Sequence, residues 1–524
     1  MSVAGTPPGD PPWWQSGVVY QVYPRSFQDT DGDGVGDLQG IIERLDHLAW
    51  LGIDAIWLSP VFRSPMRDYG YDVSDYKDID PLFGTLGDAD RLIAEAHGRG
   101  IRILLDFVPN HTSSDHPWFV DARSSRTARH RDWYVWRDPA PGGGPPNPMQ
   151  SQFGGPAWTL DETTGQYWYH SFLPQQPELD WRNPDVRAAM LDVLRFWFAR
   201  GIDGCRIDVL WMIAKDDWPW RDAPAADAAA PDAAAWGALR HGDGPTIEAL
   251  LHELRAVSDQ FPARVLVGEV YMEPPGLVRY YGKDGHGVHL PFNFTLMGVP
   301  WDAPTIGGAI AAYEAALPLG AWPNWVLGNH DQARVATRLG AAQARVAAVL
   351  LLTLRGTPTI YNGDELGLPD ALIPPDRIVD VAGRDPVRIP MPWTTDGPYA
   401  GFSTVEPWLP MPPDAGARSV EAQRDDEASM LMLHHRLLAL RRAIPALQAG
   451  AWEPVDVGPG VLAYDRVQDA DRIRVLLNMT HVPVVVRVEG RWRAAVGTTP
   501  AREGTFVEGD LTLGPDEAVV LIPA

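Results

Sequence analysis

The chain has 524 residues, of which 45% are hydrophobic, and it carries a formal net charge of -24. This length exceeds one ordinary domain, and the composition excludes disorder as the main state. The strong acidity disfavours nucleic acid and anionic membranes as partners, and the single cysteine, Cys205, excludes an internal disulfide. The first residues lack the character of a signal peptide, and no stretch is expected to span a membrane. We therefore expect a cytoplasmic protein.

Residues 18–23 are predicted to form the first strand, and an acidic loop, Asp29-Thr-Asp-Gly-Asp-Gly-Val-Gly-Asp37, follows it. Acidic side chains at alternate positions, with glycines that allow a tight wrap, are typical of Ca²⁺-binding loops, although the closing glutamate of an EF-hand is absent. We predict a structural Ca²⁺ site, at which Mg²⁺ is the alternative ion. A solvated acidic turn is the alternative interpretation. The predicted ligands are the side chains of Asp29, Asp31, Asp33 and Asp37 and the carbonyl of Val35.

Strands and helices alternate through most of the remaining chain, which is the pattern of a parallel sheet with helices on its outside. Residues 101–108 form a near-continuous apolar run, as in a strand that is buried on both faces. The alternation stops between residues 112 and 178, a segment too long for an ordinary connection, and we interpret it as an inserted subdomain. The further predicted strands are 53–59, 204–208, 264–270, 289–294, 324–328 and 357–364, and the predicted helices are 41–51, 90–98, 186–199 and 430–442.

Eight strand–helix units predict an α/β fold, a (β/α)8 TIM barrel with the inserted subdomain after strand 3. The period-two pattern after residue 452 predicts a small all-β domain at the C-terminus. A stretch rich in Ala, Pro and Asp, residues 221–235, is expected to be mobile. The predicted domains are the first part of the catalytic barrel (1–106), the inserted subdomain B (107–179), the second part of the barrel (180–450) and a C-terminal β-sandwich domain (451–524).

Residues 201–210 are predicted to form a short buried strand that delivers an acid into a cavity. Because successive side chains of a strand alternate between its faces, Arg206 and Asp208 share one face. The guanidinium of Arg206 favours the ionised form of Asp208, and an ionised carboxylate at a strand end is what a covalent nucleophile requires. A structural ion pair is the alternative interpretation. Asp203, on the opposite face at the start of the strand, is predicted to be structural.

Two further acids, Glu269 and Asp331, follow predicted strands. Parallel strands of a barrel bring their carboxyl ends to one rim, so Asp208, Glu269 and Asp331 are expected to converge. Paired carboxylates are the equipment of glycoside hydrolysis, in which one attacks the sugar and the other protonates the leaving oxygen. We predict that repulsion from the other acids raises the pKa of Glu269 and suits it to the acid role.

Four segments resemble, in order and in spacing, the signature regions of the α-amylase family of glycoside hydrolases. They are Asp106–His111, Gly204–Asp208, Gly268–Val270 and Gly328–Asp331. The resemblance covers nearly the whole chain and is nearest to the α-glucosidase and oligo-1,6-glucosidase branch, through Tyr20–Phe27 and Gln176–Asp180. It implies a retaining, exo-acting α-glucosidase that releases glucose from the non-reducing end of short α-glucosides. The acidic first loop matches the Ca²⁺ site of this branch.

The resemblance also implies a role for each matching residue. Asp208 matches the nucleophile, Glu269 the acid/base, and Asp331 the acid that holds sugar hydroxyls. Val209, directly after the nucleophile, matches a position that is usually Val in members that hydrolyse α-1,6 bonds, so isomaltose is expected to be accepted along with α-1,4 substrates. The matches to other positions around the same glucose are Asp68, Tyr71, His111, Arg206, His330 and Arg384, with Phe153 and Phe172 lining the pocket from the inserted subdomain.

Three alternatives to hydrolysis remain open at this point. A transglucosylase or a sucrose isomerase could use the same residues, since water and a sugar compete for the glycosyl intermediate. The charged Arg-Leu-Asp-Arg-Asp stretch typical of sucrose isomerases is absent near residues 292–297, which counts against isomerisation. A silent barrel used as a binding or scaffold subunit is the alternative of another class, but such proteins typically lose one of the three acids. Cys205, Asp180, Ile389 and Pro392 depart from the residues usual in the family, which bears on fine specificity. Oligomeric state has no signal in the sequence.

Overall fold

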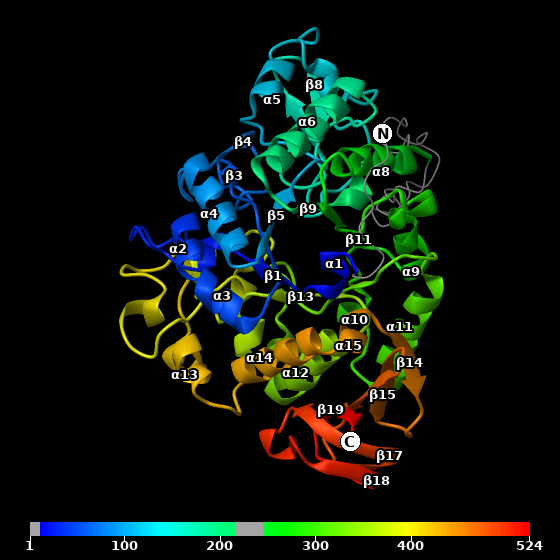
Figure 1. Cartoon of the computed structure of the whole chain (residues 1–524). Helices are drawn as coiled ribbons and strands as arrows, with labels where there is room; N and C mark the ends of the chain where they lie inside the picture. The colour runs from blue at the N-terminus through cyan, green and yellow to red at the C-terminus, as the bar shows by residue number, and fades with distance from the viewer. Residues whose placement is uncertain (1–10, 215–244) are drawn as a thin grey trace.

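The computed structural model describes residues 11–214 and 245–524, and its centre is a barrel of eight parallel strands (Figure 1). The strands are hydrogen-bonded in the order β11-β10-β9-β5-β2-β1-β13-β12, so most neighbours along the chain are also neighbours in the sheet. The predicted TIM barrel is thereby confirmed. The strands are β1 (Val19–Val22), β2 (Ala55–Leu58), β5 (Arg102–Phe107), β9 (Gly204–Ile207), β10 (Val265–Gly268), β11 (Leu290–Pro291), β12 (Asn324–Val326) and β13 (Thr357–Tyr361).

Helices cover the outside of the barrel (Figure 1). The helix predicted over residues 41–51 is two helices that meet at Arg44, whose backbone (φ −101°, ψ 3°) leaves the helical region and whose guanidinium donates to Gln28 Oε1 at 2.6 and 2.9 Å. The first begins earlier than predicted, because the Asp37 carboxylate caps it by accepting from the Gly40 N–H. The described helices are α1 (Trp13–Ser16), α2 (Leu38–Glu43), α3 (Leu45–Leu51), α4 (Leu86–Gly98), α5 (Pro117–Ala122), α6 (Pro184–Arg200), α8 (Pro245–Ser258), α9 (Pro274–Leu277), α10 (Thr295–Gly298), α11 (Ala303–Ala316), α12 (Val335–Thr353), α13 (Val420–Arg424), α14 (Met430–Ala443) and α15 (Pro445–Ala449).

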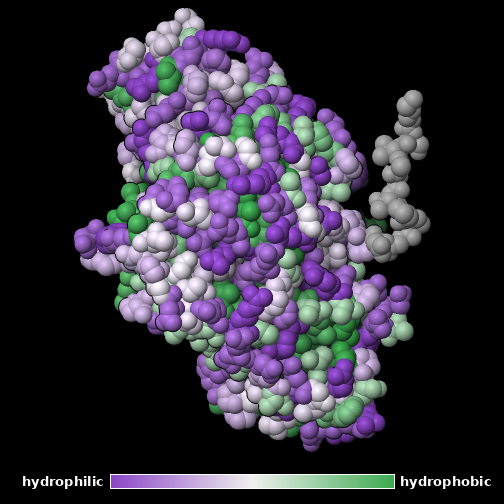
Figure 2. Space-filling model, turned by 60° about the vertical axis from the view of Figure 1, so that its left-hand side comes forward, coloured by the Kyte–Doolittle hydropathy of each residue, from purple (hydrophilic) through white to green (hydrophobic). Residues whose placement is uncertain are grey.

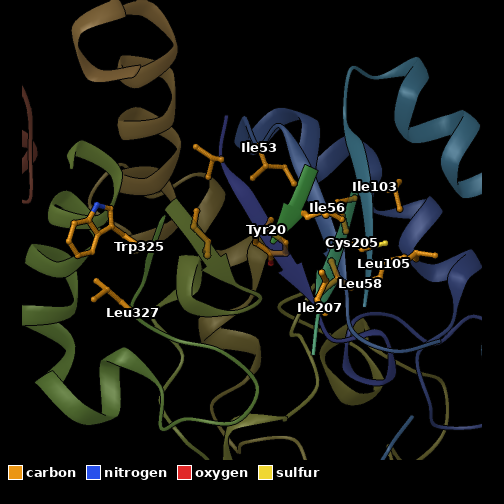
Figure 3. Close-up of a cluster of buried hydrophobic side chains, with 14 of the residues drawn as sticks. Tyr20, Ile53, Ile56, Leu58, Ile103, Leu105, Cys205, Ile207, Trp325 and Leu327 are labelled. Atoms are coloured by element: carbon orange, nitrogen blue, oxygen red, sulfur yellow. The ribbon is translucent and has the colours of Figure 1, made fainter. Parts of the chain in front are cut away.

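Two apolar layers form the core of the barrel. Side chains that point into the barrel, such as Val19 and Val265, form an inner cluster. Side chains on the other face of the strands pack beneath the helices, and Figure 3 shows this layer, in which Ile103 and Cys205 extend from the adjacent strands β5 and β9. A Cβ atom at Gly204 would lie 2.5 Å from both Val265 Cγ1 and Val265 O. Only glycine therefore lets β9 approach β10 this closely at the base of the site.

The inserted subdomain lies at one end of the molecule, drawn in cyan in Figure 1. It leaves the barrel after β5, the third barrel strand, and returns through α6, as predicted. Its antiparallel sheet has the order β6-β8-β7, and the ring of Phe119 in α5 stacks on Trp136 at 5.6 Å. The segment predicted to be mobile, 221–235, lies outside the described residues. The small strands are β3 (Phe62–Arg63), β4 (Asp75–Ile79), β6 (Trp136–Arg137), β7 (Trp158–Asp161) and β8 (Gln166–Tyr169).

The C-terminal strands lie at the opposite end, drawn in red in Figure 1, and form an antiparallel sheet in the order β14-β15-β16-β19-β17-β18. The two sheets of the predicted sandwich are one hydrogen-bonded sheet, because the long strand β17 pairs with both β18 and β19. Arg466 ties the sheet to the barrel by donating to Thr353 O and Gly450 O at 2.6 and 2.8 Å. The strands are β14 (Ala451–Val455), β15 (Val461–Gln468), β16 (Asp471–Asn478), β17 (Val484–Gly497), β18 (Phe506–Leu513) and β19 (Ala518–Pro523).

One described helix, α12, has the length and mean hydropathy (1.4) of a membrane span, which corrects the expectation that no stretch approaches one. Within its apolar window 56% is buried inside the protein, where it contacts α14 and the C-terminal sheet. Hydropathy alone does not separate such a core helix from a membrane helix. The face drawn in Figure 2 is mainly hydrophilic, with apolar residues in separate small patches.

Candidate active site

The predicted catalytic acids each follow a barrel strand. Asp208 and Glu269 follow the adjacent strands β9 and β10, whose register pairs Ile207 with Gly268. The Asp208 N–H donates to Phe107 O at 2.8 Å and the Glu269 N–H to Ile207 O at 2.9 Å, so the ladder continues through both residues. The sheet thus fixes where both side chains begin. Together with Asp331, which follows β12, they face one pocket at the carboxyl ends of the strands.

This pocket has a volume of about 420 Å³, within the range of small-molecule sites. Of the residues predicted to be catalytic or to bind substrate, all but Arg206 line it. Arg206 lies directly behind the wall and is 1% exposed. The lining residues that the sequence predicted are Asp68, Tyr71, His111, Phe153, Phe172, Asp208, Val209, Glu269, His330, Asp331 and Arg384.

The Arg206 guanidinium contacts three acids: Asp106 on β5, Asp208 directly after β9 and Glu269 directly after β10. Arg206 Nη1 donates to Asp106 Oδ1 at 2.8 Å and to Asp208 Oδ1 at 2.6 Å, and Arg206 Nη2 lies 2.9 Å from Glu269 Oε2. The same Glu269 oxygen accepts the Val209 N–H at 2.7 Å. Val209 reaches this position in the left-handed region, at φ 37°, which is costly for a β-branched residue. The cluster contains more carboxyl groups than cations, so it favours retention of a proton among its acids.

The protonation of the catalytic pair differs in part from the prediction. Burial raises the pKa of Asp208 well above its usual range, and Arg206 lowers that pKa but does not overcome burial and the nearby acids. Arg206 thus acts on Asp208 in the predicted direction, but burial opposes it and is the larger cause. Burial also raises the pKa of Glu269; Arg206 opposes this, and the charge of Asp331 adds to it. Repulsion thus acts on Glu269 as predicted, but burial is the larger cause.

Asp331 has the opposite electrostatic environment. Arg388 Nη2 donates to Asp331 Oδ1 at 3.0 Å and Arg384 Nη1 to the same oxygen at 3.3 Å, while His330 Nε2 lies 3.2 Å from Oδ2. Burial raises the pKa of Asp331, but His330 and the two arginines outweigh burial and hold this pKa well below its usual range. Asp331 is therefore the permanently ionised acid of the pocket.

Arg384 also joins two sides of the pocket. Its Nη2 donates to Asp68 Oδ1 at 2.6 Å, and Asp68 Oδ2 accepts from Gln176 Nε2 at 2.9 Å. Asp68 lies in the excursion between β3 and β4, whereas Arg384 lies in the long loop after β13, so the ion pair bridges segments far apart in the sequence. The Arg384 guanidinium lies 5.1 Å from the Phe153 ring centre, which adds a contact with the inserted subdomain.

Aromatic and imidazole rings complete the wall. Tyr71 stacks parallel to His330 at 5.4 Å, and its hydroxyl lies 2.7 Å from His330 Nε2 and 3.1 Å from Asp106 Oδ2. Burial lowers the pKa of His330 to about 3, so the imidazole is neutral near pH 7. His111 packs against Phe172 at 5.3 Å between ring centres. These rings place an apolar face and polar edges on one pocket, which suits a sugar ring.

Comparisons with known proteins agree with this geometry. The family model described as "Alpha amylase, catalytic domain" matches residues 21–450. The chain belongs to the alpha-amylase family. It is 43% identical to a probable alpha-glucosidase of Rhizobium meliloti (strain 1021), with 90% of each chain covered, and 36% identical to an oligo-1,6-glucosidase of Heyndrickxia coagulans, with 93% and 95% covered. The solved structure of an alpha-glucosyl transfer enzyme, XgtA, is 36% identical and superposes with a TM-score of 0.89 over 98% of this chain and 100% of that one. The predicted glycoside hydrolase family is confirmed.

This alpha-amylase family member has residues in and behind the pocket wall that the sequence did not single out. Asp106 and Gln176 lie inside segments that carried the resemblance, so a residue-by-residue reading of those segments would have found them. Arg388 follows Arg384 by four residues in an irregular loop, which has no periodic signal. The lining residues that the sequence missed are Gln152, Trp211, Met212, Tyr271 and Gln332.

The acidic first loop of this alpha-amylase family member lies between β1 and α2. Carboxylate oxygens of Asp29, Asp31 and Asp37 lie within 4.8 Å of one another, as the donor atoms of one cation site must. Partial desolvation, and then the negative charges of Asp33, Asp37 and Asp29, raise the pKa of Asp31. Asp33 is not part of this group, and its Oδ1 accepts the Val35 N–H at 2.7 Å. The convergent oxygens fit a hard cation, with Asp33 as the least suited of the predicted ligands.

Proposed function

We propose that this chain is a retaining, exo-acting α-glucosidase that releases α-glucose from the non-reducing end of short, neutral α-glucosides. One observation carries the proposal: Asp208 and Glu269 lie side by side on one guanidinium, in a pocket that Asp331 and the Asp68–Arg384 ion pair also line. The probable alpha-glucosidase and the oligo-1,6-glucosidase among the relatives support it. A barrel that serves only as a scaffold has no need of three convergent acids.

In the proposed reaction, an Asp208 carboxylate oxygen attacks the anomeric carbon of the bound glucose. Glu269 gives its proton to the glycosidic oxygen, the bond between the anomeric carbon and that oxygen breaks, and the aglycone leaves. Glu269, now ionised, takes a proton from water, which attacks the same carbon and frees Asp208. Two inversions return the α configuration. The ionised Asp331 accepts hydrogen bonds from sugar hydroxyls.

The shared guanidinium supports retention over inversion. Both carboxylates form an ion pair with Arg206, which favours the close pair of a retaining enzyme, about 5–5.5 Å, over the wider pair of an inverting enzyme, about 6.5–9.5 Å. The test is hydrolysis of p-nitrophenyl α-glucoside followed by proton NMR of the fresh glucose. We expect nitrophenol release with the α anomer first. The β anomer would overturn retention, and no cleavage by folded protein would overturn the glucosidase proposal in favour of the scaffold.

The pocket also supports exo action and a broad linkage range. We propose that the Asp68–Arg384 pair stops the substrate beyond its first glucose, so that only the non-reducing end enters. Val209 lines the pocket beside both catalytic acids, and through it we propose that α-1,6 bonds are accepted along with α-1,4 bonds. Maltose, isomaltose, sucrose, trehalose and nigerose, followed by product chromatography, separate these specificities. Early release from a long maltooligosaccharide of any fragment other than glucose and the chain shortened by one glucose would contradict exo action.

Transglucosylation is the second candidate, because the similar structure XgtA is an alpha-glucosyl transfer enzyme. In that case a sugar hydroxyl replaces water as the attacking group on the glucosyl–Asp208 intermediate, with Glu269 as the base. A rise in trisaccharide relative to free glucose as the maltose concentration increases would show transfer. Isomerisation of sucrose is the same chemistry with fructose as the acceptor, and its products appear in the same chromatogram.

We also propose that Asp29, Asp31 and Asp37 hold a structural Ca²⁺, or Mg²⁺ in its place. The ion would neutralise acids that lie close together and fix the turn before α2. It has no part in the proposed reaction, since the loop acids are absent from the residues that line the pocket in the described chain. We retain the prediction of a cytoplasmic enzyme.

A further inference from the structure

The Arg384 guanidinium has a partner that plays no part in the proposed reaction. Arg384 Nε donates to Asp380 Oδ2 at 2.9 Å and Arg384 Nη2 donates to Asp380 Oδ1 at 2.8 Å. The Arg384 backbone N–H also donates to Asp380 Oδ2, at 2.7 Å. Asp380 is 3% exposed and is absent from the described residues that line the pocket. It therefore reaches the substrate only through Arg384.

The two bonds to Asp380 fix the plane of the guanidinium. A carboxylate that accepts from both Nε and Nη2 holds the planar group by one whole edge. With that edge held, Nη1 faces Asp331 and the second proton of Nη2 faces Asp68. Without Asp380, the guanidinium would keep its contacts with Asp331, Asp68 and the Phe153 ring, but no carboxylate would hold a whole edge of it.

We infer that Asp380 is a positioning residue, which orients Arg384 so that one guanidinium holds both Asp68 and Asp331 at the glucose-binding end of the pocket. This inference rests on the proposed function. It assigns a buried carboxylate in the loop after β13 a part in substrate affinity, at a distance from the reacting carbon. It also gives a role to the buried Asp380 carboxylate, which within the described chain forms an ion pair only with Arg384.

Asp380→Asn tests the inference without changing the size of the side chain. An amide offers one acceptor oxygen, so whichever way it is placed its nitrogen faces an N–H group of Arg384. We expect KM for p-nitrophenyl α-glucoside to rise about tenfold, the equivalent of about 1.4 kcal/mol, with kcat little changed. The calorimetric Kd for glucose should rise by the same factor, and this measurement needs no turnover. Asp380→Glu keeps both acceptor oxygens and should remain closer to the wild type.

Asp385→Asn is the matched control. Asp385 is equally buried in the same loop, but its Oδ2 accepts only the backbone N–H groups of Val379 and Asp380, at 2.7 and 3.0 Å. An amide oxygen can replace that acceptor, so we expect KM and Kd close to wild type. An equal rise in KM for Asp385→Asn would show that the loop as a whole, rather than the orientation of Arg384, sets affinity, and would overturn the inference.

A double-mutant cycle gives the decisive comparison. If Asp380 acts through Arg384, Asp380→Asn should have no further effect on KM or glucose binding in the Arg384→Gln background. An undiminished effect in that background would overturn the inference, as would a wild-type KM for Asp380→Asn alone. Failure of the proposed function looks different, because the wild-type enzyme itself would then release no nitrophenol.

Discussion

The protein gathers acidic side chains in two places, the pocket and the first loop, and balances their charge differently. In the pocket, the carboxyl groups are largely buried and the protein supplies its own cations, Arg206, Arg384 and Arg388. In the first loop, none of the four acids forms an ion pair within the described chain. Their partners are backbone N–H groups, as where Asp29 accepts from Gly32 and Gly34, and the hydroxyls of Thr30 and Ser403. The same residue type is thus balanced by arginines in the pocket, whereas in the first loop we propose that a bound cation balances it.

The pocket itself contains both outcomes of this balance. Asp331, with two arginines and a histidine on it, has its pKa held low, whereas burial raises the pKa of Asp208 and Glu269, which share a single arginine. A retaining glycosidase needs an ionised carboxylate and a protonated one in the same site. The uneven number of arginines thus separates Asp331 from Asp208 and Glu269, and between the latter two the proposed reaction needs one ionised carboxylate and one proton.

The largest effect should follow removal of the proposed nucleophile. We expect Asp208→Asn to lower kcat for p-nitrophenyl α-glucoside by several orders of magnitude with the fold intact, because an amide cannot form the glucosyl–enzyme bond. Asp203→Asn is the control: its carboxylate, five residues earlier, accepts from the Ile103 N–H at 3.0 Å and contacts His97, which supports its predicted structural role. It should change thermal stability more than turnover. Near-native activity of Asp208→Asn would contradict the nucleophile assignment and favour a structural role for the Arg206–Asp208 ion pair.

The pH profile should show the shared proton. The nucleophile must be ionised, so a raised pKa of Asp208 moves the acidic limb of the kcat/KM profile to higher pH. The acid must be protonated, so a raised pKa of Glu269 moves the basic limb to higher pH as well. Both limbs should therefore lie above about 4, the ordinary carboxyl range. α-Glucosyl fluoride needs no proton on its leaving group, and with it the basic limb should disappear. An acidic limb at or below that ordinary range would contradict the effect of burial.

Much of this comparison could be predicted from sequence, because regular elements carry it. The acids Asp208, Glu269 and Asp331 follow apolar strands, and parallel strands have to bring their ends to one rim. Backbone geometry outside the strands was less predictable. At Arg44, where the helix is interrupted, the side chain contacts Gln28 across the acidic loop, and β17 pairs with both β18 and β19 through register shifts within the strand. Neither feature changes the hydrophobic periodicity of the sequence.

The protonation of the pocket acids was harder to predict than which residues line the pocket. Alternation along β9 correctly placed Arg206 beside Asp208, yet the sequence does not show that Asp106 competes for the same guanidinium or how deeply the group is buried. Arg388 and Asp380 lie in an irregular loop, where spacing predicts no contact. Burial and long-range partners, rather than residue type, decide protonation, and both are properties of the folded chain.

Glu365 offers an intermediate case, a buried acid with neither an arginine nor a candidate ion among its described partners. It accepts from the Tyr20 hydroxyl at 2.7 Å and the Gly363 N–H at 2.8 Å, and burial raises its pKa to about 7 from 4.5. Its folded-state pKa lies above its unfolded value, so the stabilising protonated form is lost as pH rises through about 7. The free energy of unfolding should fall by on the order of 3 kcal/mol when ionisation is complete. Between pH 4.5 and about pH 7, the unfolded and folded pKa values of Glu365, the free energy of unfolding of Glu365→Gln should depend less on pH than that of the wild type, as measured by chemical denaturation. An identical slope would contradict this prediction.

The smallest effect is expected at the first loop, where we propose that a bound Ca²⁺ supplies the balancing charge. Chelation of Ca²⁺ should lower the thermal midpoint by a few degrees, since an ion that binds only the folded state stabilises it by mass action, by about 2.7 kcal/mol at a hundred times its Kd. Activity below the midpoint should be unchanged, because the loop acids do not line the described pocket. An unchanged midpoint, with no bound metal by elemental analysis, would leave the loop a solvated acidic turn.

Two neighbouring substitutions sharpen this test of the loop. Asp31→Asn removes a member of the convergent group, so the added stability from Ca²⁺ should be lost, and apo protein should gain a little because one of several like charges is gone. Asp33→Asn changes the same charge two residues along, but the Asp33 carboxylate serves the turn and not the group, so the Ca²⁺ response should persist. If both variants lose the Ca²⁺ response equally, local negative charge rather than ligand geometry determines Ca²⁺ binding in the loop. The loop and the pocket would then differ less sharply in how their acids are balanced.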